Sequence, residues 1–249
     1  MASEKLLWVA FFDYARSCLQ QIADAGVATA KQAAATSEIE PVAHAVLLRA
    51  KCTSDAIKIL IENGLLQDAA ALSRGLVESE IFLRACEKDR KLTLEELERD
   101  WHYGREGHAK LVTEAMRAKP NDRQFAAQIV HENRGGARLD WKALSKRAGD
   151  VDPYILFRRI SSIEGHLTAG SLQPHYQYDL NGNWSGFFTR PFSANEAEEL
   201  FFECSRELIK IGQAYVALLG ISDEVFDWAS VVANFSAGVL PSEALGAKA

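Results

Sequence analysis

Apolar residues recur every three to four positions along most of this chain, which is the spacing of one buried face of an α-helix. In the stretch VAHAVLLRAKCTSDAIKILIEN, Val46, Ala50, Ile57 and Ile61 fall on one such face. The longest helices predicted in this way cover residues of about 4–33, 41–64, 65–88, 93–119, 152–170 and 194–220, with shorter helices between and after them. The pattern predicts an all-α protein, a single bundle of about seven or eight helices.

Individual residues mark where some of these helices begin and end. Gly64 follows an apolar run and is a natural C-cap. Thr93 with Glu96, and Ser193 with Glu196, have the spacing of a capping box, in which the two side chains satisfy backbone N–H groups of the first helical turn. Helices are therefore expected to begin at Thr93 and at Ser193.

Residues 173–192 depart from the helical pattern. In QPHYQYDLNGNWSGFFTRPF, aromatic residues alternate with polar ones on either side of Asn181-Gly182-Asn183, which predicts a small β-hairpin or an ordered loop. No internal repeat or linker-like segment divides the chain, so we expect one helical domain over residues 1–235. The small residues of 236–249 predict a flexible C-terminal tail.

The composition is that of a soluble globular protein, with 48% hydrophobic and 25% charged residues. A net charge of −6 argues against general binding to duplex nucleic acid, although it is compatible with a local basic patch. No run approaches the roughly 18–20 apolar residues of a membrane span, so no membrane association is expected. The cysteines are too widely spaced for a disulfide framework or a zinc site, and we expect buried, reduced thiols in a cytoplasmic protein at Cys18, Cys52, Cys86 and Cys204.

The stretch FRRISSIEGHLTAG, residues 157–170, holds the first candidate site. At helical spacing Arg159, Ser162 and His166 share one face. Arg159 can neutralise a phosphate oxygen and His166 can transfer a proton, so the pair is a candidate catalytic site for phosphodiester cleavage. In the alternative interpretation, His166 caps a helix end or belongs to a hydrogen-bonded core network.

Arg74 and Glu78 form a second candidate group, because they are separated by four residues on an otherwise apolar helix. A buried charge must be partnered to avoid a desolvation cost of several kcal/mol, so an ion pair is expected. The pair either fixes the helix register or lines a polar pocket, as one end of a network that reaches His166 or Tyr154.

The segment RDWHYGREGH, residues 99–108, is the third candidate. His102 falls on a face with Arg99 and Glu106, while Arg105 falls near Trp101 and His108. The spacings match neither the Glu-x-x-His pairs of di-iron bundles nor the H-E-x-x-H zinc motif, so no metal and no cofactor is expected. A solvated polar face is the alternative to a ligand site.

Four features together resemble a bacterial all-helical family that is known only as a domain of unknown function. They are KCTS at 51–54, ALSRGLVESEIFL at 71–83, Tyr154, and Ser161-Ser162 ahead of His166. The resemblance covers residues of about 40–220. Members of that family typically carry an arginine–glutamate pair on a central helix and a later Ser…His helix.

In this chain Arg74, Glu78, Ser161 and His166 occupy the matching places. The family is in turn distantly similar to the HEPN superfamily, whose members include metal-independent ribonucleases with an Arg-x(4–6)-His motif. Arg159 and His166 have the longest of these spacings.

The resemblance implies a homodimer that binds or cleaves RNA in bacterial defence or stress response. In the mechanism it implies, His166 assists attack by a ribose 2′-hydroxyl or protonates the leaving oxygen, and Arg159 stabilises the charged intermediate. Arg74 and Glu78 would orient the site, with support from Ser162, Tyr154, His102 and Arg105. The other hypothesis is a non-enzymatic helical interaction or regulatory protein, with a regulatory protein partner, in which the Arg/Glu/His network is structural.

Overall fold

The computed structural model describes residues 2–33, 39–115, 119–163, 176–178, 181, 183–187, 193–222, 224 and 226–240. The helices in these residues are α1 (Ala2–Ala33), α2 (Ile39–Glu62), α3 (Leu66–Lys88), α4 (Arg90–Glu114), α5 (Pro120–Glu132), α6 (Trp141–Ala148), α7 (Asp152–Ile163), α9 (Ala194–Leu219) and α10 (Trp228–Ala237). The predicted all-helical class is confirmed, but the described residues contain nine helices where seven or eight were expected. No helix among them is long and apolar enough to cross a membrane.

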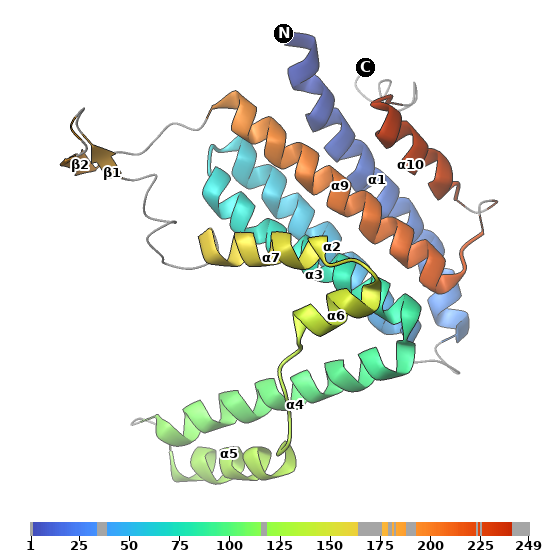
Figure 1. Cartoon of the computed structure of the whole chain (residues 1–249). Helices are drawn as coiled ribbons and strands as arrows, with labels where there is room; N and C mark the ends of the chain where they lie inside the picture. The colour runs from blue at the N-terminus through green and yellow to red at the C-terminus, as the bar shows by residue number, and fades with distance from the viewer. Residues whose placement is uncertain are drawn as a thin grey trace.

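Four long helices, α1, α2, α3 and α9, pack side by side and enclose the main hydrophobic core (Figure 1). Fully buried side chains from all four meet there, among them Phe12, Leu47, Leu76, Leu208 and Tyr215. Helix α3 contacts both α2 and α9, which explains why its apolar residues are not confined to one face. Burial of this apolar surface is the main force that holds the bundle together.

A second, smaller core lies on the other side of α3. There Val77 and Ile81 of α3 pack against Leu144 of α6 and against Phe157 and Ile160 of α7. These contacts fix α7, the helix that carries the first candidate site, against the middle of the bundle.

Helices α4 and α5 form an arm that extends away from the bundle (Figure 1). The arm is held at its base by Arg147 of α6, whose guanidinium donates two hydrogen bonds to Glu96, at 2.8 and 2.9 Å, and one to the Thr93 hydroxyl. The loop between α5 and α6 lies directly on α4 at Gly136, because a Cβ on Gly136 would fall 2.2 Å from the Tyr103 amide nitrogen. The arm is therefore anchored at its base while much of α4 remains open to solvent.

The helix boundaries confirm one predicted capping box and contradict the other. Ser193 and Glu196 make both hydrogen bonds of the box at the start of α9. Helix α4 instead begins at Arg90, because the Asp89 side chain caps it by accepting from the Leu92 amide. The Thr93 hydroxyl is buried and donates to the Asp89 carbonyl, so the expected start at Thr93 is wrong.

Within the segment 173–192, two short strands are described. Strand β1 (Tyr176–Tyr178) pairs antiparallel with β2 (Trp184–Phe187), with Gln177 opposite Gly186. At the C-terminus, α10 ends at Ala237, within two residues of the boundary expected between the domain and the tail, and the flexible tail stays a prediction. Residues 241–249, the rest of that expected tail, lie outside the described residues.

Three of the four cysteines are buried as expected, namely Cys18, Cys86 and Cys204. Cys52 is exposed, which corrects the prediction for that residue. It lies on the outer face of α2, because the buried face of that helix is formed by residues such as Ala50 and Ile57.

Candidate functional site

Arg159 lies on α7 and points to α9. Its guanidinium contacts both carboxylate oxygens of Glu203, at 3.2 and 3.3 Å, and the arginine side chain is 57% exposed. The pair lines a shallow depression of about 250 Å³ between α3, α7 and α9, which Glu196 and Glu199 also line. Three glutamates therefore surround one arginine, and this charge balance disfavours a polyanionic ligand.

The other residues of this candidate site have structural roles or are not described. The Ser161 hydroxyl is buried and donates to the carbonyl of Phe157 within its own helix. The Tyr154 ring stacks on the Phe157 ring, with 6.0 Å between centroids. Ser162 belongs to α7, but its side chain and all of His166 lie outside the described residues, so the pairing of Arg159 with His166 stays a prediction.

Arg74 and Glu78 form the expected ion pair along α3, with Arg74 Nε 3.1 Å from Glu78 Oε1. Glu78 is largely buried and accepts a second hydrogen bond, at 3.0 Å, from Arg49 of α2. The Arg74 guanidinium also lies over the Phe157 ring, 4.6 Å from its centroid. The group thus joins α2, α3 and α7.

His102 and Arg105 lie on different faces of the α4–α5 arm. His102 Nδ1 is 2.7 Å from Asn133 Oδ1, so the histidine faces the C-terminal end of α5, and Glu106 pairs with Lys110 rather than with His102. Arg105 is exposed and lies 6.0 Å from the Trp101 ring centroid. The arm thus separates two residues that the sequence had suggested for one site.

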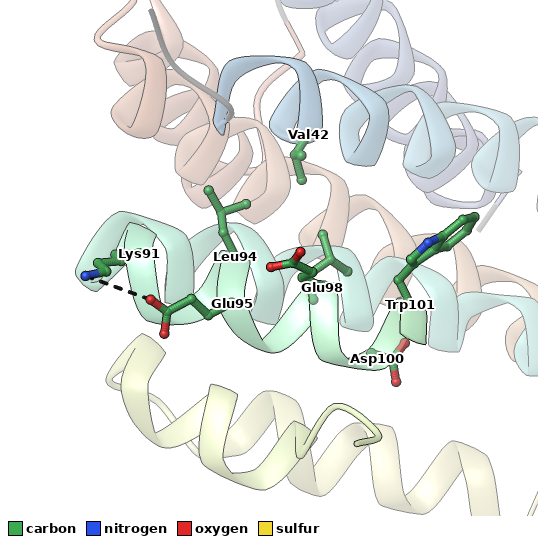
Figure 2. A pocket seen from close by; sticks show the side chains of 8 residues that line it. Val42, Lys91, Leu94, Glu95, Glu98, Asp100 and Trp101 are labelled. Carbon is green, nitrogen blue, oxygen red and sulfur yellow. Dashed lines mark ion pairs between the residues drawn. The ribbon is translucent and has the colours of Figure 1, made fainter. Parts of the chain in front are cut away.

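A groove of about 720 Å³ runs between α4 and the start of α2 (Figure 2). Leu94 and Trp101 project from the side of α4 that faces α2, where Val42 lies, and Trp101 is 64% exposed. The lining is formed by Val42, Lys91, Leu94, Glu95, Leu97, Glu98, Asp100 and Trp101. Glu95 and Glu98 are exposed on its α4 side with Lys91, while the Asp100 carboxylate points away from α2 and accepts a hydrogen bond from the Leu139 amide. The site is apolar at its base and negatively charged at its rim.

A second groove, of about 290 Å³, lies further along the arm between α4 and α5. Arg105, His108 and Val112 line it from α4, and Phe125, which is 64% exposed, lines it from α5. One side of α4 therefore contributes to both grooves, the first acidic and the second basic and apolar.

Sequence reasoning missed a pair of buried carboxylates between α3 and α9. Glu80 and Glu207 are almost completely buried, and one oxygen of each accepts no hydrogen bond within the described residues. Burial, and then the neighbouring Glu207 carboxylate, raise the pKa of Glu80 to about 8. The available signal was a glutamate within the apolar run VESEIFLRAC, at a position that faces the core.

The described residues contain no group of three or more His, Cys, Asp or Glu side chains that could hold a metal ion. No protein-family model, no curated protein and no solved structure matches this chain.

Proposed function

We propose that this protein is a non-enzymatic helical interaction protein, which binds a protein partner through the exposed face of α4. The observation that carries the proposal is Trp101, which is 64% exposed beside a groove of about 720 Å³. An exposed tryptophan next to an apolar groove is typical of a binding hot spot, because its burial by a partner removes a large apolar surface from water.

The other candidate groups support the proposal because their charged side chains already form ion pairs and a ring contact within the molecule. Arg159 pairs with Glu203, and Arg74 pairs with Glu78 while it covers Phe157. The contact of Arg159 with Glu203 joins α7 to α9, and that of Arg74 with Phe157 joins α3 to α7. The pair of Arg74 with Glu78 stabilises α3 itself. Such a network accounts for the arginines without a substrate.

The charge around the α4–α2 groove favours a protein over RNA. Glu95 and Glu98 are exposed and form a rim that repels phosphates and attracts basic side chains. Apolar residues at its base, such as Leu94, suit apolar side chains of a protein. The partner should therefore present apolar and basic residues together.

Site-specific photo-crosslinking in living cells tests this proposal. A benzophenone amino acid in place of Trp101 should give one defined protein adduct, identified by mass spectrometry. The same group at Ile155, an exposed apolar residue of α7, is the matched control and should give none. Absence of a specific adduct at position 101 would contradict the proposal.

A ribonuclease assay tests the competing hypothesis. Purified wild type is incubated with single-stranded RNA in the presence of a metal chelator, beside Arg159→Ala and His166→Ala. We expect no cleavage by any of the three. Cleavage by wild type that both substitutions abolish, with folding retained by circular dichroism, would replace the interaction proposal with the ribonuclease.

A further inference from the structure

One face of α4 carries a stripe of residues with alternating spacings of four and three. Successive residues of α4 are rotated by about 100°, so these positions stay on one side of the helix over its whole length. We call this set the α4 stripe; it consists of Leu94, Glu98, Trp101, Arg105, His108 and Val112. All of its members are exposed except Leu94, which is half-buried.

Helix α5 leaves the stripe uncovered because it packs on the neighbouring face of α4. The contact face is marked by the buried Ala109, by His102, which bonds to Asn133, and by the buried Ala126 of α5. The stripe lies beside this contact and is exposed from Glu98 to Val112, while Leu94 at its start also packs against the main core.

When a second α4 stripe lies against the first in the opposite direction, residues of complementary chemistry face each other. Positions equally distant from residue 103 pair Leu94 with Val112 and Trp101 with Arg105. The remaining pair sets a carboxylate opposite an imidazole, Glu98 with His108. Apolar residues thus meet apolar residues, a cation meets an aromatic face and an acceptor meets a donor. In a two-fold antiparallel pair of helices, each of these contacts is made twice.

The two grooves beside the stripe are complementary in the same sense. In an antiparallel pair, the acidic α4–α2 groove of one copy faces the α4–α5 groove of the other, which holds Arg105, His108 and Phe125. Each groove also contains one residue of the opposite charge: Lys91 lines the acidic groove, and Asp122 lines the groove that holds Arg105 and His108. Phe125, exposed on α5, lies beside the helix face that would enter the larger groove.

We propose that the α4 stripe pairs antiparallel with the same stripe of a second copy of this chain, with the two-fold axis midway along the stripe, between Trp101 and Arg105. This inference rests on the proposed function and names the partner. Charge complementarity selects a second copy, because the chain supplies both halves of every pair. Arg105, which lies 6.0 Å from the Trp101 ring centroid of its own chain, then also covers Trp101 of the other copy.

Sedimentation equilibrium of charge variants tests the pairing and its register. Glu98→Lys removes the acceptor from His108 of the second copy, and His108→Glu places two carboxylates opposite each other. Each variant alone should raise the dimer Kd at least about tenfold. An equimolar mixture should recover a dimer of near wild-type affinity, because lysine at 98 then faces glutamate at 108.

Glu114→Lys is the matched control, since this exposed residue of α4 lies off the stripe and its substitution should leave the Kd unchanged. Circular dichroism establishes that each variant is folded. A wild type that is monomeric at micromolar concentration, or single variants that dimerise as wild type does, would overturn the inference. A photo-adduct of position 101 with a different protein would overturn it too, while the proposed interaction function would stand.

Discussion

Glu80 of α3 and Glu207 of α9 place two carboxylates in one buried interface. The Lys210 ammonium lies between them, 3.6 Å from Glu80 Oε1 and 3.4 Å from Glu207 Oε1. Arg84 also contacts Glu80, at 3.1 Å, and lies 3.6 Å from Asp150. Even with these cations nearby, burial and the second carboxylate favour a protonated Glu80, whose pKa is raised to about 8.

This pKa predicts a pH-dependent effect of Glu80→Gln. Because the pKa is higher in the folded state than in the unfolded chain, near 4.5, protonated Glu80 stabilises the fold most at low pH. That stability is lost as the pH rises through 8. Glutamine mimics the protonated acid, so the variant should match wild type at pH 5 and exceed its free energy of unfolding at pH 9 by on the order of 1–3 kcal/mol.

Urea denaturation at a series of pH values measures this difference. Glu199→Gln, at an exposed position of α9, should show the same pH dependence as wild type. If the difference between Glu80→Gln and wild type stays constant from pH 5 to pH 9, Glu80 is not protonated in the fold.

The ion pair at the base of the arm predicts a second effect on stability. Glu96 accepts two hydrogen bonds from Arg147, and both side chains are largely buried. Glu96→Gln should lower the free energy of unfolding by about 1–3 kcal/mol, because it leaves the guanidinium poorly partnered. Glu95→Gln is the control: its carboxylate is half-exposed and 3.9 Å from Lys91, so a change below about 0.5 kcal/mol is expected. Equal effects in a urea titration would show that the buried pair does not anchor the arm.

Sequence patterns predicted those features of the fold that depend only on residues close together in the chain. The box of Ser193 and Glu196 and the left-handed C-cap at Gly64 are confirmed, because each needs only one turn of helix. Thr93 misled because Asp89, four residues earlier, supplies the cap and the threonine hydroxyl is used by Arg147 instead. Two competing caps cannot be ranked without knowledge of what packs beside them.

The candidate site was less predictable because its contacts join distant helices. Nothing local indicates that Arg159 meets Glu203, or that Glu80 meets Glu207. A polar helix such as α4 also has the same sequence pattern whether it is solvated on all sides or projects as an arm with an exposed Trp101. The contacts that hold α4 at its base, from Arg147 of α6 to Glu96 and Thr93, join residues about 50 positions apart in the chain.

Cys52 is predicted to be the one reactive thiol of the folded protein. Thiolates react, and burial raises the pKa of Cys18 to about 11 and of Cys86 to about 12, while Cys52 is exposed. A thiol-specific reagent such as Ellman's reagent should therefore titrate one cysteine quickly in native protein and all four in denaturant. Cys52→Ser should abolish the fast phase. A fast phase that survives this substitution would mean that a buried cysteine becomes accessible.

Two glycine positions test the packing of the bundle against that of the arm. A Cβ at Gly212 would lie 2.0 Å from the buried Trp228 ring, so α9 and α10 approach closely only because this residue has no side chain. Gly212→Ala should lower the free energy of unfolding by about 1–3 kcal/mol. At Gly107 of α4, in contrast, a Cβ would meet no atom of another described element within 4 Å, and Gly107→Ala should raise the free energy of unfolding by about 0.5–1 kcal/mol through helix propensity.

Thermal and urea denaturation of both variants measure these opposite shifts. The same chemical change is made at both sites, so intrinsic propensity alone predicts two stabilised proteins. A destabilised Gly212→Ala beside a stabilised Gly107→Ala therefore isolates the contact with Trp228. Stabilisation of both would mean that α10 does not pack on α9 at Gly212.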